Sequence, residues 1–473
     1  MSSVVMTAYH ALPPGARSLA ASLRGLYLSR WRFGPETDRL VDEALERDRW
    51  SDGQWTAWRE DALARLLDRA ATRVPYYRDL WAKRRAAGDR RAWDVLANWP
   101  TLPKQVLRER PESFVADDCD RRRMFEERTS GTSGTPLRLW WTRETVRRWY
   151  ALYEARIREW NGVGRRDRWA MLGGQPVVPA SAQRPPFWVV NRPMRQMYMS
   201  ANHISRANGG DYRRALARYG PTHMIAYASS ATLLAQVFES LGDGPRLPLV
   251  ITNAEPLFPW QREQMLRSLA ERVRETYGMA EIVAAASECD AGALHLWPDV
   301  GILEAHADAE AIPAVHGQTG QFVATGLINQ DMPLIRYEVG DRGSLAHTSA
   351  CSCGRTLPRL ATVEGRTNDV LIGTNGRFVY WVNPIFYGMP VREAQIVQES
   401  VARIVIRVVP GSGFSASSRQ VIAGRARERL GDLAVVFDEV DAIPRGSNGK
   451  FRAVVCAIPP EERAGALRAP VAP

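Results

Sequence analysis

The chain has 473 residues, of which 45% are hydrophobic and 24% are charged, and this composition excludes disordered, collagen-like and disulfide-scaffold classes. It contains no apolar run of the roughly 18 residues that a membrane-spanning helix needs, and its first residues lack the apolar core of a signal peptide. The five cysteines are too few for a secreted disulfide framework. We therefore expect a cytoplasmic protein with no membrane partner.

The net charge is +11, and arginine supplies nearly all the basic residues, with lysine only at Lys83, Lys104 and Lys450. Acidic residues interrupt the arginines, as in residues 39–49, and no basic run exceeds three residues. This favours a solvated surface over a nucleic-acid interface. We therefore expect no nucleic-acid partner, and we keep a zinc-bearing nucleic-acid-binding protein as the alternative of a different class.

The first 125 residues are predicted to be mostly helical. Ser51 is a suitable N-cap for a helix whose apolar residues recur every three or four positions from Trp55 to Ala70. Val74 and Pro75 end that pattern.

An alternation of strands and helices follows from about residue 165 to 350. Short apolar runs at 168–172, 223–227 and 249–252 are predicted strands, and 230–241 has helical spacing. Such alternation predicts an α/β fold.

A separate, compact α/β unit is predicted after residue 365. It has β-branched or apolar strand patterns at 404–409, 435–437 and 453–455, and a helical pattern at 419–430 with Gly431 as its C-cap.

The strongest local motif is the loop Thr129-Ser130-Gly131-Thr132-Ser133-Gly134-Thr135-Pro136. Its glycines let backbone N–H groups converge on an anion, and its hydroxyls supply further donors, so it is suited to a nucleotide triphosphate. An ordinary polar hairpin turn is the alternative. The loop is not the P-loop of NTPases, because the G-x-x-x-x-G-K-[ST] pattern is absent.

The chain resembles the adenylate-forming enzymes in six motifs that occur in the family's order. They are the loop at 129–136, Asn253-Ala254-Glu255-Pro256, Tyr277-Gly278-Met279-Ala280-Glu281, Arg336-Tyr337-Glu338-Val339-Gly340-Asp341, Gly365-Arg366-Thr367-Asn368-Asp369, and Pro444 to Lys450. Within that family it most resembles the phenylacetate–coenzyme A ligase branch and its capsular-polysaccharide-biosynthesis relatives. The segments 74–78, 102–104 and 391–398 carry this closer resemblance.

The resemblance implies a large domain followed by a small one. Residues 1–125 would form a helical region and residues 126–365 the ATP- and acid-binding core, which together make the large domain. Residues 366–473 would form a small, mobile C-terminal α/β domain that swings about Asp369 and carries Lys450.

Three cysteines and one histidine form a candidate metal site. Cys289, His295, Cys351 and Cys353 offer three thiolates and one imidazole, which suit tetrahedral zinc with no open position. Their spacing alone leaves buried, unligated cysteines as an alternative, and His306, His316 or His347 could replace His295. The phenylacetate-ligase branch carries a matching pattern, so the resemblance implies a structural zinc ion.

The resemblance also implies the chemistry, in which ATP and a carboxylic acid give an acyl-adenylate and pyrophosphate. Lys450 would neutralise charge between the α-phosphate and the attacking carboxylate, and Glu281 would hold Mg²⁺. The remaining nucleotide-binding residues would be Thr129, Ser130, Gly131, Thr132 and Gly134 for the phosphates, Ala254, Glu255, Pro256, Tyr277 and Gly278 for adenine, and Asp341 and Arg366 for the ribose side.

The acyl acceptor is expected to be coenzyme A or an amine. Residues 378–384 depart from the usual glycine-rich acceptor segment, which argues against coenzyme A, and Thr135 and Ala280 also depart from the family's pattern. Natural-product or polysaccharide biosynthesis is the expected context, as a monomer or a homodimer. A catalytically silent scaffold is disfavoured because Glu281, Asp341 and Lys450 are retained. Candidates for binding the acid are Trp188, Asn191, Met194, Tyr198, Tyr227 and Ser229.

Overall fold

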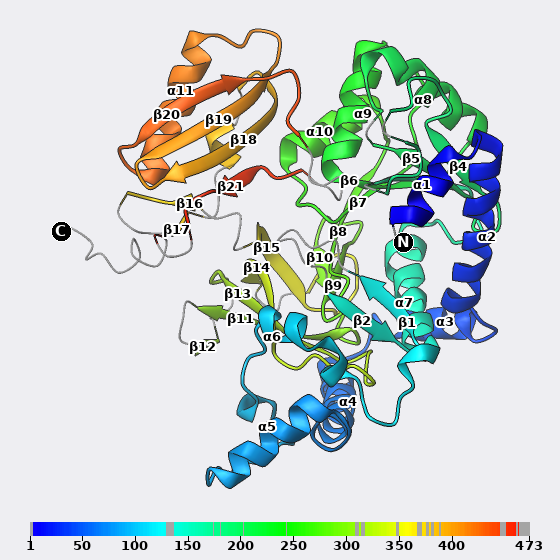
Figure 1. Cartoon of the computed structure of the whole chain (residues 1–473), viewed down its shortest axis with the longest axis vertical. Coiled ribbons are helices and arrows are strands. Elements are labelled where there is room, and N and C mark those ends of the chain that lie inside the picture. The colour runs from blue at the N-terminus through cyan, green and yellow to red at the C-terminus, as the bar shows by residue number, and fades with distance from the viewer. Residues whose placement is uncertain are drawn as a thin grey trace. The chain divides into compact units, whose positions relative to one another are not determined.

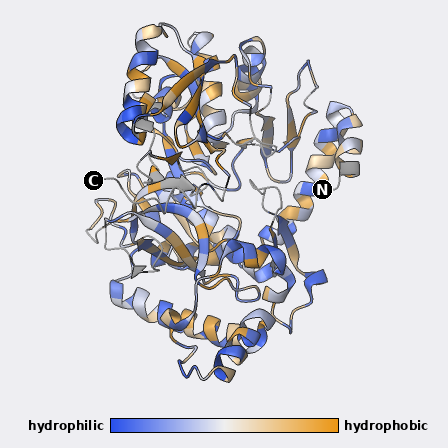
Figure 2. Cartoon of the chain, turned by 60° about the vertical axis from the view of Figure 1, so that its left-hand side comes forward, coloured by the Kyte–Doolittle hydropathy of each residue, from blue (hydrophilic) through white to orange (hydrophobic). Residues whose placement is uncertain are grey.

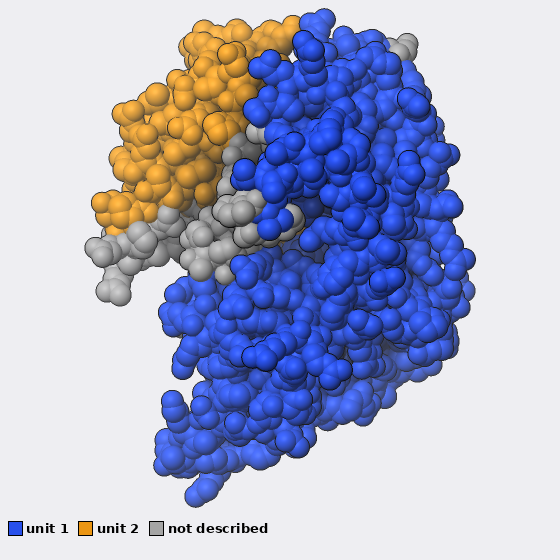
Figure 3. Space-filling view, turned by 45° about the vertical axis from the view of Figure 1, so that its right-hand side comes forward, with its two compact units in different colours: residues 1–339, 343–362 blue, residues 340–342, 363–473 orange. Residues whose placement is uncertain are grey.

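The computed structural model divides the chain into two compact units. Unit 1 comprises residues 1–339 and 343–362, and unit 2 comprises residues 340–342 and 363–473 (Figure 3). The structure describes residues 3–128, 137–173, 175–179, 181–201, 203–242, 244–307, 312–313, 317–346, 350–366, 371–374, 378–379, 383–386, 389–444, 451–459 and 462.

Unit 1 begins with helices, as the sequence predicts. They are α1 (Ser3–Ala11), α2 (Pro14–Arg32), α3 (Thr37–Arg47), α4 (Asp52–Arg73), α5 (Pro75–Ala86) and α6 (Lys104–Glu109) (Figure 1). The predicted cap is confirmed. The Ser51 side chain accepts a hydrogen bond from the Gln54 backbone N–H, and the Gln54 side chain accepts one from the Ser51 backbone N–H, which together form a capping box. Helix α4 ends at Arg73, and its C-cap Val74 has an extended backbone before Pro75.

A 13-stranded sheet forms the centre of the fold, in the order β12-β11-β13-β14-β15-β10-β9-β8-β7-β6-β3-β5-β4. Its strands are β3 (Trp169–Gly173), β4 (Trp188–Asn191), β5 (Gln196–Ser200), β6 (His223–Tyr227), β7 (Val250–Asn253), β8 (Val273–Gly278), β9 (Ala285–Glu288), β10 (Leu294–Leu296), β11 (Gly301–Ala307), β12 (Ile312–Pro313), β13 (Gly320–Gly326), β14 (Tyr337–Leu345) and β15 (Arg359–Arg366). The strands β5, β3, β6, β7 and β8 run parallel to one another, whereas β4 is an antiparallel edge strand and β9 and β10 continue antiparallel.

Helices α8 (Arg206–Tyr219), α9 (Ala228–Ser240) and α10 (Pro259–Ser268) pack with the parallel strands around one hydrophobic core. Parallel strands are buried on both faces, which explains why β6 is buried along almost its whole length. Helices α8 and α9 approach closely at Gly209, where an added Cβ would lie 2.4 Å from Val237 Cγ1. The predicted α/β class is therefore confirmed.

The remaining elements of unit 1 are an antiparallel pair and one long helix. Strand β1 (Phe125–Arg128) pairs with β2 (Arg138–Trp141) on either side of the serine-, threonine- and glycine-rich loop. Helix α7 (Arg143–Tyr153) continues through a π-helical turn at Glu154–Arg158 and a 3₁₀ turn at Glu159–Asn161. Among the described residues, no helix has both the length and the apolarity to cross a bilayer.

Unit 2 contains a four-stranded sheet in the order β20-β19-β18-β21. Its strands are β18 (Val391–Ser400), β19 (Arg403–Pro410), β20 (Ala434–Glu439) and β21 (Val454–Cys456), and it is accompanied by the pair β16 (Leu371–Ile372) and β17 (Phe378–Val379). Helix α11 (Ala416–Leu430) packs on this sheet through Ile422, Ala426 and Leu430, which share a core with Ile396, Ile404 and Ile406. The strands and the helix predicted here are confirmed, with ends shifted by one to three residues.

Candidate functional site

The carboxyl ends of the parallel strands carry the residues predicted for the adenine side of the nucleotide. Strands β3, β6, β7 and β8 end at Gly173, Tyr227, Asn253 and Gly278. Because these strands are parallel, their carboxyl ends share one edge of the sheet, which is where ligands bind in open α/β folds.

The segment after β7 has an unusual backbone conformation. Ala254 has φ of +64°, which a non-glycine residue adopts only at a cost and which is common at binding sites. Glu255 Oε2 accepts a hydrogen bond of 2.8 Å from the backbone N–H of Ser229 in the first turn of α9. This contact joins the segment Ala254-Glu255-Pro256 to the end of β6.

Tyr277 and Gly278 close β8, and the Tyr277 ring lies edge-on to Phe322 with ring centres 6.0 Å apart. Thr276 Oγ1 donates to the Thr252 carbonyl at 2.8 Å, which ties β8 to β7 beside this position. The residues predicted for the adenine side therefore lie at the ends of two neighbouring strands.

Glu281 is buried beyond β8 and carries two charge-assisted contacts. Its Oε1 accepts from Lys104 Nζ at 2.9 Å and from the Tyr337 hydroxyl at 2.9 Å. Burial acts to raise the pKa of this carboxyl, but the Lys104 ammonium and the hydrogen bonds from Lys104 and Tyr337 hold the pKa below its usual value. Glu281 is therefore a carboxylate, the form that a magnesium ligand requires.

The partnership of Lys104 with Glu281 was missed by the sequence analysis. The two residues are 177 positions apart, and Lys104 opens the short helix α6. The signal that could have found it is the scarcity of lysine, since Lys104 is one of only three in the chain. Tyr337, whose side chain is fully buried, also belongs to the Arg336–Asp341 motif but had no role assigned.

Arg336, the arginine of that same motif, makes contacts that stabilise the fold. Arg336 has φ of +46°, and its Nη1 donates to the Trp99 carbonyl at 2.8 Å while its Nε contacts Glu304 at 3.2 Å. These bonds fix the backbone immediately before Tyr337. Asp341 is half-buried within β14, and Arg366 is the last residue of β15.

Several predicted residues lie outside the described part of the chain. They are Thr129, Ser130, Gly131, Thr132, Gly134 and Thr135 of the phosphate loop, the hinge residue Asp369, the catalytic Lys450, and the side chain of Arg366.

The six candidate acid-binding residues lie at the two ends of the strands: four lie at the carboxyl ends, here called the carboxyl edge, and two lie at the opposite ends. Tyr198 and Tyr227 lie at the carboxyl edge, where a Cβ added to Gly173 would be 3.3 Å from the Tyr198 hydroxyl and 3.7 Å from Tyr227 Cε1. Ser229 follows Tyr227, and Trp188 pairs with Met199 near the same edge. Asn191 and Met194 lie at the opposite edge, because β4 runs antiparallel to β5.

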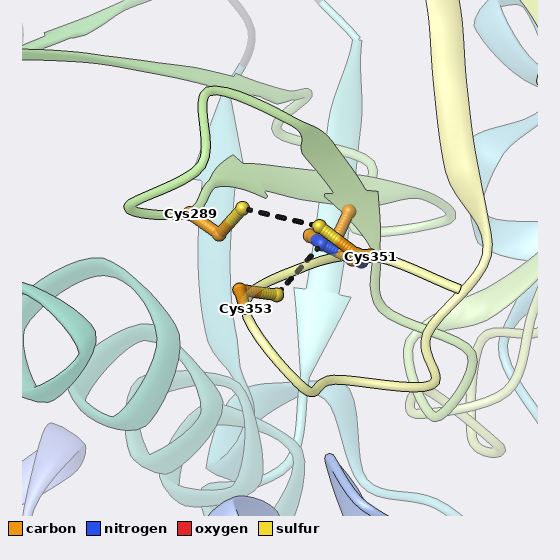
Figure 4. Close-up of side chains that lie close together, drawn as sticks. Cys289, Cys351 and Cys353 are labelled. Atoms are coloured by element: carbon orange, nitrogen blue, oxygen red, sulfur yellow. Dashed lines mark hydrogen bonds between the residues drawn. The ribbon is translucent and has the colours of Figure 1, made fainter. Parts of the chain in front are cut away.

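The predicted metal ligands Cys289, His295, Cys351 and Cys353 converge in the structure, with their donor atoms all within 4.8 Å of one another (Figure 4). The Cys289 and Cys351 sulfurs are 3.8 Å apart, and Cys353 Sγ is 3.4 Å from His295 Nε2. Tetrahedral zinc with ordinary bond lengths places two sulfurs about 3.8 Å apart and a sulfur and a nitrogen about 3.5 Å apart. The donor set and its spacing therefore fit zinc.

The surroundings of the cluster also fit a metal centre. His295 Nδ1 lies 3.0 Å from the Leu357 carbonyl, which accepts its proton and leaves Nε2 for a metal. Burial raises the pKa of the Cys289 thiol to about 11, so a bound cation would displace a proton there. His306, an alternative ligand, instead contacts Glu304 and Arg336, whereas His316 and His347 lie outside the described residues.

An aromatic cluster covers the cysteines on the side of α4. Trp55 and Trp160 share a core with Cys289, Cys351 and Leu357. The Thr356 N–H donates to the Asp48 carbonyl at 3.0 Å, and the Asp48 carboxylate binds the fully buried Arg156. The cysteine cluster and the aromatic residues that cover it thus join the loop after β9 and the loop before β15 to the N-terminal helices.

The comparisons with known proteins agree with this geometry. The family model described as the CapK C-terminal domain matches residues 371–457. Protein CapK of Staphylococcus aureus is 23% identical over 387 residues, which cover 80% of this chain and 84% of CapK. Phenylacetate-coenzyme A ligase of Thermus thermophilus is 28% identical over 478 residues, which cover 89% of this chain and 99% of that enzyme.

The solved structures show the same fold. A crystal structure of 2-hydroxyisobutyryl-CoA ligase in the postadenylation state matches with a TM-score of 0.67 at 19% identity, covering 88% of this chain and 92% of that one. This likeness, at 19% identity, shows a shared fold. The chain is similar over most of its length to phenylacetate-coenzyme A ligase and CapK, which supports placing it among the adenylate-forming ligases, in the branch related to these two proteins.

Proposed function

We propose that the protein uses ATP to convert a carboxylic acid into an acyl-adenylate and then transfers the acyl group to coenzyme A or an amine. The observation that carries this proposal is the ionised, buried Glu281 at the carboxyl edge of the sheet, held by Lys104 and Tyr337. Its neighbours are the Tyr277 and Ala254 segments, which are suited to the adenine side of ATP.

In the first half-reaction a carboxylate oxygen attacks the α-phosphorus, and pyrophosphate leaves. Two anions must meet, so charge neutralisation dominates the barrier. Lys450 is assigned to the point between the two anions, where a compact ammonium contacts oxygens on both. Magnesium held at Glu281 would offset phosphate charge, and the loop at 129–136 would hold the β- and γ-phosphates.

The second half-reaction passes the acyl group to the acceptor and releases AMP. Coenzyme A is supported by the similarity to phenylacetate-coenzyme A ligase, while the altered segment at 378–384 supports an amine. The rest of the proposal assigns Asp341 and Arg366 to the ribose side, and Tyr198 and Tyr227 to the acid.

The cysteine cluster is assigned a structural zinc ion. All four positions of a tetrahedral site would be filled by protein donors, which leaves no position for substrate or water. When bound, the ion would hold the two loops of the cluster against the N-terminal helices, and it has no part in adenylation.

Pyrophosphate release from ATP, measured over a panel of carboxylic acids with coenzyme A or amines added in turn, tests the proposal. Glu281→Gln removes the charge but keeps the shape, and we expect it to lower adenylation by about 10²–10³-fold. Glu275→Gln is the matched control, because Glu275 is a partly buried glutamate of β8, six residues before Glu281, whose pKa burial raises to about 7. If no acid supports pyrophosphate release, or if both variants behave alike, the assignment is wrong.

A further inference from the structure

Helix α2 packs on the edge of the large sheet with its small, polar face inward. Ser22 Oγ donates to the Val190 carbonyl of β4 at 3.2 Å, and Ser18 Oγ accepts from the Val190 N–H at 3.3 Å. At Gly25, an added Cβ would collide with the Asn191 side chain at 2.0 Å, so only glycine allows this close approach. An amphipathic helix of a globular protein normally buries its apolar face instead.

The apolar face of α2 therefore points to solvent. Leu19 and Leu23 are each 62% exposed, Leu26 is 42% exposed and Tyr27 is 53% exposed. Their spacing places these four residues, here called the N-terminal stripe, on one side of the helix. Six of the eleven large exposed hydrophobic side chains among the described residues lie in or beside α1 and α2 (Figures 1 and 2). Such a concentration marks an interaction surface.

The charge around this stripe is strongly one-sided. Residues 1–35 and 168–210 contain nine arginines and no aspartate or glutamate, which leaves 54 basic and 52 acidic residues in the rest of the chain. The expectation that acids interrupt the arginines throughout is thus wrong for these two segments. They pack together in the structure, since α2 lies on β4 and the Tyr9 hydroxyl donates to the Val177 carbonyl.

Within the described part of the chain, none of these nine arginines forms a salt bridge, whereas the other arginines do so repeatedly. Glu127 acts electrostatically on Arg24 and Arg32 without an ion-pair contact. The exposed members of the set are Arg24, Arg30, Arg168, Arg184, Arg192, Arg195 and Arg206.

We propose that the N-terminal stripe and its arginines dock the protein on the surface of an anionic lipid bilayer. Leucine and tyrosine side chains enter the boundary between headgroups and acyl chains, and arginines contact the lipid phosphates. Arg24 and Arg30 flank the stripe on α2, and the Arg192 N–H donates to Ser22 Oγ beside it. This replaces the expectation of no membrane partner with reversible attachment to one face.

Other occupants fit the surface less well. A second copy would bring the same unpaired arginines together, which costs energy between like charges. A nucleic acid would satisfy the arginines, but it offers no apolar surface to Leu19, Leu23 and Leu26. A lipid surface supplies both kinds of contact at once.

Co-sedimentation of the full chain with vesicles tests the proposal. Vesicles of equal phosphatidylcholine and phosphatidylglycerol should bind the protein at least about tenfold more tightly than phosphatidylcholine alone, and added salt should weaken the binding. The double variant Leu19→Glu, Leu23→Glu should lose about tenfold or more in binding. Both leucines are exposed and outside the proposed active site, so folding and adenylation should be unchanged.

A matched control is Val421→Glu, which adds a charge at a 42% exposed valine of α11 in unit 2 and should bind vesicles normally. The pair Arg24→Gln, Arg30→Gln should weaken binding and flatten its salt dependence. The proposal is overturned if the wild type ignores anionic vesicles, or if the double-glutamate variant binds them as the wild type does. It is also overturned if light scattering shows that the wild type is a dimer and the double-glutamate variant a monomer, while neither protein binds vesicles.

Discussion

Glu275 lies within β8 and Glu281 follows that strand, and their pKa values shift in opposite directions although burial acts to raise both. Burial raises the pKa of Glu275 to about 7, helped by the nearby Glu288 and opposed by the Leu257 N–H and Arg262. Burial has the same tendency at Glu281, but Lys104 outweighs it and lowers the pKa. A dedicated cation decides whether a buried acid stays charged.

The cysteine cluster extends this comparison to a third site. Burial acts to raise the pKa of the Cys353 thiol, but hydrogen bonds from Arg355 and from the neighbouring cysteines hold it below its usual value. Burial raises the pKa of the Cys289 thiol to about 11. A bound zinc ion would supply the positive charge that Cys289 lacks, whereas Glu281 has an internal cation. We therefore expect the cysteine cluster, Glu281 and Glu275 to differ in how much their stability depends on a neighbouring cation.

Loss of the proposed zinc should have the largest effect. We expect about one equivalent of tightly bound zinc in purified protein, and Cys351→Ser should sharply reduce the yield of folded protein, because structural zinc contributes folding free energy directly. Cys119→Ser is the control, since Cys119 lies outside the cluster. Elemental analysis that finds well-folded protein without metal would refute this prediction.

Lys104→Met should have an intermediate effect, because it leaves Glu281 buried without its counter-ion. We expect a loss of stability of about 1–3 kcal/mol, since Lys104 is partly exposed and a charged hydrogen bond contributes about that much. ATP with magnesium should raise the melting temperature more in this variant than in the wild type, because the metal replaces the missing charge. Lys83→Met, at an exposed lysine, is the control, and equal shifts in all three proteins would contradict the pairing.

Glu275→Gln should have the smallest effect, and it should depend on pH. The folded-state pKa of Glu275 lies above its unfolded value, so the wild type loses stability as pH rises from about 4.5 through 7. Glutamine does not titrate, so the variant should melt a few degrees, about 2 °C or more, above the wild type at pH 8 and level with it at pH 5. A difference in melting temperature that grows toward low pH would contradict this prediction, because it would mean that a nearby cation lowers the pKa of Glu275.

Local patterns in the sequence were enough to predict many elements but not the pairing of distant ones. The Ser51 cap and the apolar run 223–227 are decided by neighbouring residues, so α4 and β6 were predicted correctly. Cys289 and Cys351 converge across 62 residues; the residue types suggested a shared metal site, and the family resemblance was needed to favour it over unligated cysteines. The Lys104–Glu281 pair had no local signature at all.

The sequence also did not predict which ends of the strands carry the candidate acid-binding residues, or which face of α2 packs on the sheet. Asn191 and Met194 are close in sequence to Tyr198, but the antiparallel turn between β4 and β5 carries them to the opposite edge. Helix α2 turns its leucines outward because Ser18, Ser22 and Gly25 fit the edge strand β4 more closely. Periodicity finds the apolar face of a helix without showing which way it points.

The central claim is that this chain forms an acyl-adenylate and then transfers the acyl group, and Lys450→Ala tests it most directly. The measurement compares the rate of adenylation with the rate of acyl transfer from a chemically prepared acyl-adenylate, in the same variant. Lys450 neutralises charge while two anions meet, so adenylation should fall by about 10²–10³-fold while acyl transfer survives. Lys450→Arg should restore little, because a planar guanidinium does not fit between two oxygens. An equal fall in both rates, or intact adenylation, would contradict the claim.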